Sequence, residues 1–505
     1  MWTTRLGIAS LTALCAFVDL GADGTEARLM DAVKARNSEA VRTLVKQPGA
    51  VNVPEADGTT ALHWAVRADD IATAQLLLRA GARPGTANRY GVTPISLAAV
   101  NGNAAMIEAL VRAGADPNTP LAGGETVLMR AARTGNPEAL EMLLAHGADA
   151  NHKERTLGET ALMWAAAEDN AAAVQMLLHH GADANARSNL LSFPKANGAR
   201  TANALVSVVM PRGGWTALMY AARRGSTDSV RVLADRGADL DVVDPDGTNA
   251  LIYAIINAHY DAAAVLLEKG ANPNLADSRG MAALYAAVDM HTLPWLAARP
   301  VPKTTDRSTS LDIVKTLLAR GADPNAQLKG RLLQKQHTAG DPSLGEGATP
   351  FMRAAKSGDV AVMRLLLAKG ADPHLMQKNH TTALMMAAGF GWRGAAASGA
   401  DRGTEAESIE AIKLCLELGL DLNAFNDAGL TPMHMAVNRG DNVIRFLAER
   451  GGRMDVKDKQ GRTPLDAALR GGAEEVRDSQ VRETTAPLLR QLMANAAKGT
   501  GASAQ

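Results

Sequence analysis

Residues 214–246 read GWTALMYAARRGSTDSVRVLADRGADLDVVDPD, and this stretch decides the fold class. Its first half predicts a short helix, because Thr216 is a good N-cap and the pair Ala221-Ala222 lets a neighbouring helix approach closely. Its second half predicts another helix that buries a Val and Leu face and ends at Gly237, which suits a left-handed C-cap. An aspartate and a glycine then favour a tight turn. The stretch therefore predicts two helices followed by a hairpin.

The same pattern recurs along the chain with a period of 33 residues. A Thr-Ala-Leu or Thr-Pro-Leu type of marker occurs eleven times between residues 60 and 465. A second marker, Gly-Ala-Asp or a variant of it, keeps the same phase from Gly81 to Gly419. Units of this length cannot bury their apolar faces alone, so they stack on their neighbours.

Both markers together resemble the ankyrin repeat, over nearly everything from residue 25 to residue 475. The resemblance implies an all-α repeat solenoid of about 12 units, each a helix-turn-helix with a β-hairpin finger, in a curved stack. The family pattern has histidine after Thr-Pro-Leu, which here only His63 and His434 keep, whereas methionine holds most of the other positions. This methionine-rich style also resembles exported bacterial ankyrin proteins.

The ends of the chain differ from the repeats. Residues 1–24 contain an uncharged run from Leu6 to Val18, which fits a cleaved signal peptide and predicts a periplasmic or secreted protein. An uncleaved N-terminal helix or a misassigned start is the alternative. No other apolar run reaches 18 residues, so we expect no membrane span. Cleavage would leave one cysteine, Cys415, in an apolar helical pattern that predicts burial.

The remaining chain divides by its repeats. The expected segments are an N-terminal capping repeat (25–56), an array with insertions at 186–213, 290–308, 326–346 and 389–406 (57–475), a C-terminal capping helix (476–497) and a disordered tail (498–505). The first and third insertions follow Gly-Ala-Asp and would extend hairpin fingers. The second and fourth fall between paired helices and would lie on the opposite edge. Each insertion is either functional or a tolerated surface loop.

The resemblance implies binding through the concave side, at the hairpin tips and at the two positions after each alanine pair. We call these two positions the helix-end row. Cations outnumber acids there and at the tips, although the chain has 53 basic and 53 acidic residues. The sequence therefore favours a non-enzymatic, monomeric scaffold that binds an acidic protein partner, unless these cations merely aid solubility. The candidate partner-binding residues are Arg67, Arg89, Arg133, Arg155, Arg223, Arg224, Lys356, Arg439, Trp215, Trp295 and Trp392. Trp295 and Trp392 are further expected to pack together as an aromatic patch.

Other functions have weaker support. Aromatic residues make up 3% of the chain and no recognition motif appears, so nucleic acid is disfavoured as a partner. The sequence has no phosphate loop, haem motif or zinc helix, and we expect no cofactor. His146, His179 and His180 offer a metal pair or, more simply, a solvated ladder. A secreted effector or inhibitor of a foreign protein remains an alternative, as does an enzyme with a site on the inserted loops.

Overall fold

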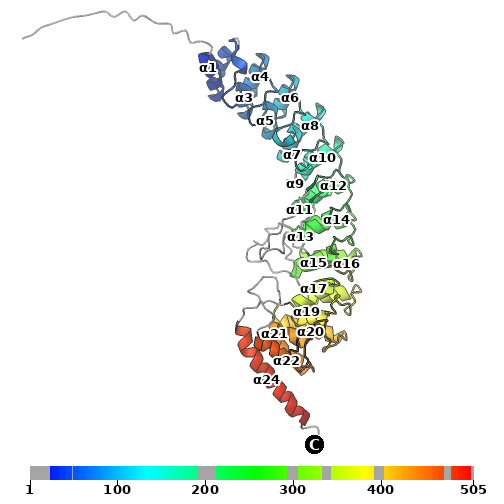
Figure 1. The fold of residues 1–505 in the computed structure, drawn as a ribbon. Helices are drawn as coiled ribbons and strands as arrows, with labels where there is room; N and C mark the ends of the chain where they lie inside the picture. Colours follow the sequence, from blue (N-terminus) through cyan, green and yellow to red (C-terminus); the bar gives the residue numbers. More distant parts are fainter. Residues whose placement is uncertain are drawn as a thin grey trace, which may run out of the picture. The chain divides into compact units, whose positions relative to one another are not determined.

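The computed structural model describes residues 23–47, 49–191, 212–292, 305–332, 343–391, 403–470 and 479–501. The chain divides into two compact units, residues 1–149 and 150–505, which are described separately. Both are built from consecutive helix pairs joined by hairpin-like fingers (Figure 1). The expected all-α repeat architecture of about 12 units is confirmed, because the described residues contain twelve such pairs.

Unit 1 contains four pairs. Its first helices are α1 (Asp23–Lys34), α3 (Ala61–Arg67), α5 (Pro94–Asn101) and α7 (Val127–Thr134), and its second helices are α2 (Ser38–Leu44), α4 (Ile71–Arg79), α6 (Ala104–Arg112) and α8 (Pro137–Ala145). Two 3-10 helices, η1 (Ala50–Asn52) and η2 (Ala122–Gly124), lie in the connections. First helices pack on first helices and second helices on second helices, which makes two layers.

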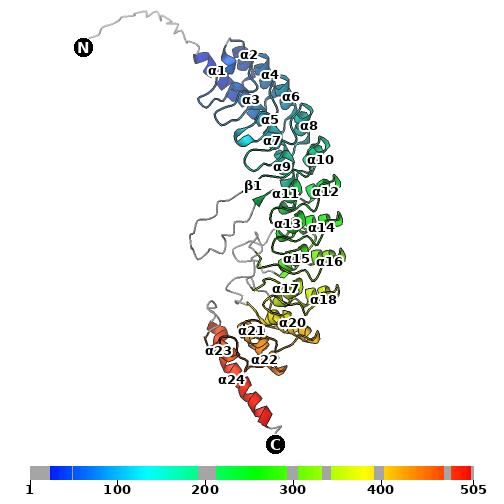
Figure 2. The ribbon, with the colours of Figure 1, turned by 45° about the vertical axis from the view of Figure 1, so that its right-hand side comes forward.

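Unit 2 continues the same plan. Its first helices are α9 (Ala161–Ala167), α11 (Ala217–Arg224), α13 (Ala250–Ile256), α15 (Ala283–Thr292), α17 (Pro350–Ser357), α19 (Ala383–Ala388), α21 (Pro432–Arg439) and α23 (Pro464–Arg470). Its second helices are α10 (Ala171–His179), α12 (Thr227–Asp235), α14 (Tyr260–Glu268), α16 (Ser310–Ala319), α18 (Val360–Leu367), α20 (Glu405–Glu417), α22 (Asp441–Glu449) and α24 (Ser479–Gly501). A short antiparallel pair, β1 (Leu190–Leu191) and β2 (Arg212–Gly213), lies within the first insertion (Figure 2).

Threonine starts the first helices as the sequence predicts. The Thr216 side chain accepts the backbone N–H of Met219 at 3.4 Å, and Thr349 does the same for Met352 at 3.2 Å. The methionines that replace the family histidine are buried, and Met129 even accepts the Thr126 N–H through its sulfur at 3.4 Å. Soft thioether packing therefore fills this position in five of the eleven repeats that carry the marker.

The two histidines that keep the family pattern link successive repeats. His63 caps its own helix at Thr60 and contacts the Val92 carbonyl oxygen of the next finger at 3.1 Å. His434 contacts the Arg462 carbonyl in the same way, also at 3.1 Å. Burial is the main cause that lowers the pKa of both rings, so both are neutral at physiological pH.

An asparagine ladder joins neighbouring fingers, and the sequence reading missed it. Asn325 donates from Nδ2 to the Gly370 carbonyl at 2.9 Å and accepts the Asp372 N–H at 2.7 Å. Asn118 makes the equivalent bonds to Gly147 and Asp149, both at 2.8 Å. The available signal was the asparagine that recurs two residues after the aspartate of Gly-Ala-Asp.

Several expectations about the segments meet the structure directly. The last helix is described as far as Gly501, beyond residue 498 where the tail was expected to begin. Residues 1–22, which hold most of the expected signal peptide, lie outside the described residues. Cys415 is fully buried, as expected, and burial raises the pKa of its thiol to about 12. Among the residues that the structure describes, no helix is both long and apolar enough to span a membrane.

Candidate protein-binding surface

Most of the predicted cations on the helix-end row and fingers face solvent. Arg67, Arg133 and Arg224 at the ends of first helices are exposed, as are Arg89 and Arg155 on the fingers. Two of these side chains stack on aromatic rings of their own unit. Arg67 lies 5.3 Å from the centre of the Trp64 ring, and Arg89 lies 5.2 Å from that of Tyr90. Such stacking orients a guanidinium group without neutralising its charge.

Trp215 is the centre of an aromatic cluster in unit 2. Its ring centre lies 5.3 Å from that of Tyr220 on α11 and 5.0 Å from that of Tyr253 on α13. The half-buried Arg223 sits over the same indole at 4.9 Å. The sequence named Trp215 and Arg223 as candidates, but it gave no sign that they contact one another.

Two carboxylates hold the rim of this cluster. Glu159 accepts the Trp164 indole N–H at 2.8 Å and the Tyr220 hydroxyl at 2.7 Å. Asp244 accepts the Tyr253 hydroxyl at 2.6 Å. Burial, and then the adjacent carboxylate, raises the pKa of each tyrosine well above its usual range, so both hydroxyls remain donors. The cluster is thus a rigid, internally hydrogen-bonded part of the surface.

Lys356 and Arg439 contradict the expectation that the helix-end row is open to solvent. Lys356 is 4% exposed and donates to Ser343 Oγ at 2.7 Å. Arg439 is 6% exposed and donates to the Thr404 carbonyl at 3.0 Å. The physical reason is that residues flanking the insertions, which the repeat pattern does not contain, cover these positions.

The flanks of two insertions lie together, against expectation. Ser343 lies within the insertion at 326–346, and Gly391 lies within the one at 389–406, yet a side chain at Gly391 would collide with Ser343. These insertions therefore do not lie on opposite edges of the repeats where the structure describes their flanks. Trp295 and Trp392, the other half of the aromatic prediction, lie outside the described residues.

A buried ion pair lies close to Lys356 in sequence. Arg353, at 1% exposure, donates from Nε to Asp289 Oδ1 at 2.5 Å and from Nη1 to Ser357 Oγ at 2.7 Å. Asp289 occupies the helix-end row of its own repeat. The charged side chains in this part of the helix-end row contact other groups of the chain, so they are not available to a partner.

The described residues of this surface offer little support for an enzymatic function. The Lys356–Ser343 contact has the residue types of a serine–lysine nucleophile pair. However, both residues are buried, and a side chain at Gly391 would collide with Ser343. Over the described ranges, no three His, Cys, Asp or Glu side chains cluster as metal ligands. His146 instead contacts the Met142 carbonyl at 2.8 Å.

Comparison with known proteins identifies the repeats. A family model described as ankyrin repeats (three copies) matches residues 29–121, 98–188, 195–277, 306–397 and 402–478, which is well over half of the chain. The chain belongs to the ankyrin repeat family. Members of this family are typically protein–protein interaction scaffolds without enzymatic activity.

Individual relatives add little to the family assignment. An ankyrin repeat and LEM domain-containing protein 1 homolog of Caenorhabditis elegans is 45% identical over 60 residues, which cover 12% of this chain and 8% of that protein. The human ASB11 ankyrin repeat domain is 25% identical with a TM-score of 0.40, over 48% of this chain and 98% of that one. The chain therefore spans only a small part of the curated relative that it matches.

Proposed function

We propose that this ankyrin repeat protein binds an acidic surface of a protein partner through the exposed cations of the helix-end row and the fingers. One observation carries the proposal. Within the described residues, the exposed side chains of Arg67, Arg155 and Arg224 form no ion pair with a carboxylate of the chain. Cations of this kind on a rigid scaffold speed association with an acidic partner and make it sensitive to salt.

The buried cations set the limit of this surface. Lys356 and Arg439 donate their hydrogen bonds within the chain, so we exclude them from the proposed binding residues. The half-buried Arg223 and the Trp215 ring contribute a firm, flat contact area beside the exposed Arg224. Aromatic and arginine side chains of this kind are enriched at binding hot spots.

The compartment is part of the proposal. The uncharged run in residues 6–18 supports export to the periplasm or beyond, where the partner would reside. Cell fractionation with N-terminal sequencing of the purified protein tests this directly. A mature N-terminus near residues 22–24 in the envelope fraction is the expected result, and an intact Met1 in the cytoplasm would refute it.

Affinity capture tests the binding surface. Immobilised full chain should capture a partner from an envelope fraction, and rising salt should release it. The triple variant Arg67→Glu, Arg133→Glu, Arg224→Glu should lose this capture. Arg112→Glu, Arg236→Glu, Arg320→Glu is the matched control, because these exposed arginines also follow or end helices but belong to second helices. Equal capture by both variants would refute the proposed surface.

A further inference from the structure

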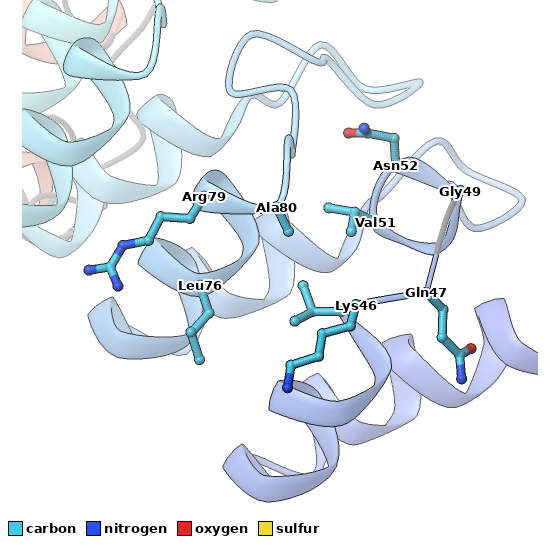
Figure 3. A pocket seen from close by; sticks show the side chains of 9 residues that line it. Lys46, Gln47, Gly49, Val51, Asn52, Leu76, Arg79 and Ala80 are labelled. Carbon is cyan, nitrogen blue, oxygen red and sulfur yellow. The ribbon is translucent and has the colours of Figure 1, made fainter.

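A pocket of about 570 Å³ lies between α2 and α4 in unit 1 (Figure 3). Val45, Val51, Leu76 and Ala80 provide its apolar lining, and Lys46 and Arg79 are its charged residues. It belongs to the second-helix layer and is therefore separate from the helix-end row. Its volume falls within the range of about 300–1,000 Å³ that is typical of ligand sites.

The second helix of the first pair is shorter than the second helix of the next pair. α2 has 7 residues, whereas α4 has 9. After α2 the chain turns at Gly49, with a φ of 85°, into the 3-10 helix η1. Leu76 of α4 is half-exposed beside this connection.

The far wall of the pocket is held by the asparagine ladder. Asn52 donates to the Gly81 carbonyl and accepts the Arg83 N–H, both at 2.9 Å. These bonds fix the end of η1 to the end of α4, so the pocket needs no partner to form. A preformed site loses less conformational entropy when it binds.

Both charged residues that line the pocket are basic. The Lys46 and Arg79 side chains are exposed, and within the described part of the chain neither forms a hydrogen bond or an ion pair. No acidic residue lines the pocket. In Figure 3 the Arg79 side chain extends from α4, the helix that also carries Leu76, and the Lys46 side chain extends from the turn after α2. Arg79 offers a planar fork suited to one carboxylate, and Lys46 offers a point charge for a second.

We infer that this pocket binds an acidic segment of a partner protein. One apolar side chain of that segment rests on Val45, Val51 and Leu76, while its carboxylates pair with Lys46 and Arg79. Charge complementarity selects this occupant, because an apolar floor between two unpaired cations matches a leucine flanked by acidic residues. The pocket gives the scaffold a second contact point, independent of the helix-end row.

Fluorescence anisotropy with a labelled Asp-Leu-Glu-Leu-Asp peptide and the full chain tests this inference. The peptide should bind at low salt, and Lys46→Glu with Arg79→Glu should weaken it by at least about tenfold, since each close charge pair contributes of the order of one kcal/mol or more. Arg28→Glu with Arg112→Glu changes the net charge of the same unit equally and should leave binding unchanged. Leu76→Gln should also weaken binding, because it makes the apolar floor of the pocket polar and leaves both cations in place.

Three results would overturn the inference. One is equal binding by the Lys46/Arg79 variant and the wild-type chain, and another is equal binding of a Lys-Leu-Lys-Leu-Lys peptide. The third is binding of dodecanoate without binding of the acidic peptide, which would make the pocket a fatty-acid site. Substitutions in the helix-end row should not affect the acidic peptide, so failure here is distinguishable from failure of the proposed function.

Discussion

Arg133 and Lys356 occupy the same position in their repeats, directly after an alanine pair, yet their surroundings differ completely. Arg133 is exposed at the end of α7, whereas Lys356 at the end of α17 is 4% exposed and bonded to Ser343. The difference arises from the insertions, whose flanking residues cover the second position. A repeat position thus fixes where a side chain starts, while the local insertions decide whether it meets solvent.

The largest expected effect on stability concerns the ion pair between Asp289 and Arg353, in the region that the insertions cover. Asp289→Ala should leave the Arg353 guanidinium buried without its carboxylate and lower the free energy of unfolding by about 3–5 kcal/mol. Urea unfolding followed by circular dichroism measures the effect. The double variant Asp289→Leu with Arg353→Met removes both charges and should lower the free energy of unfolding by much less. A cost for Asp289→Ala near that of a surface substitution would show that the pair is solvated.

A direct comparison of the two equivalent cations follows. Lys356→Met should destabilise the protein by about 1–3 kcal/mol, because it removes a buried hydrogen bond that a charged group donates to Ser343 Oγ. Arg133→Met should stay within about 0.5 kcal/mol of the wild type, as is usual for exposed residues. Urea unfolding again measures both effects. An equal loss of unfolding free energy for the two substitutions would contradict the distinction between the buried and the exposed cation.

The asparagine ladder should not distinguish the two regions. Asn118→Ala and Asn325→Ala each remove one donated and one accepted hydrogen bond between exposed fingers. Each should cost about 1 kcal/mol, since all four hydrogen bonds lie between exposed groups. Thermal or urea unfolding of the two variants gives the comparison. A much larger cost at Asn325 would mean that the insertions also shield the fingers of unit 2.

The smallest effect concerns pH. Burial lowers the pKa of His63 and His434 in the folded state, so the unfolded chain binds protons more readily. Stability should therefore be full above the unfolded pKa of about 6.5 and fall as the pH drops below it. His63→Met with His434→Met, which copies the other repeats, should flatten the stability profile between about pH 7.5 and 5.5. An unchanged slope would show that other groups control it.

The sequence predicted the repeat architecture well because each repeat signals itself locally. Threonine caps, alanine pairs and terminal glycines act over a few residues, and all of them appear as expected in α11 and α17. The long-range contacts could not be predicted in the same way. The cover over Lys356 comes from Ser343, which lies within the insertion at 326–346, and nothing in the repeat pattern signals that Arg223 lies over Trp215. The pocket at Lys46 depends on where α2 ends and the 3-10 helix η1 begins.

The central claim is that exposed cations of the helix-end row, and not the buried ones, contact the partner. The most direct measurement is the affinity of the captured partner for two folded variants of the full chain, Arg133→Met with Arg224→Met and Lys356→Met. We predict that the first loses affinity by about tenfold and shows a shallower salt dependence, while the second binds like the wild type. Wild-type affinity for the first variant, or an equal loss for both, would contradict the account.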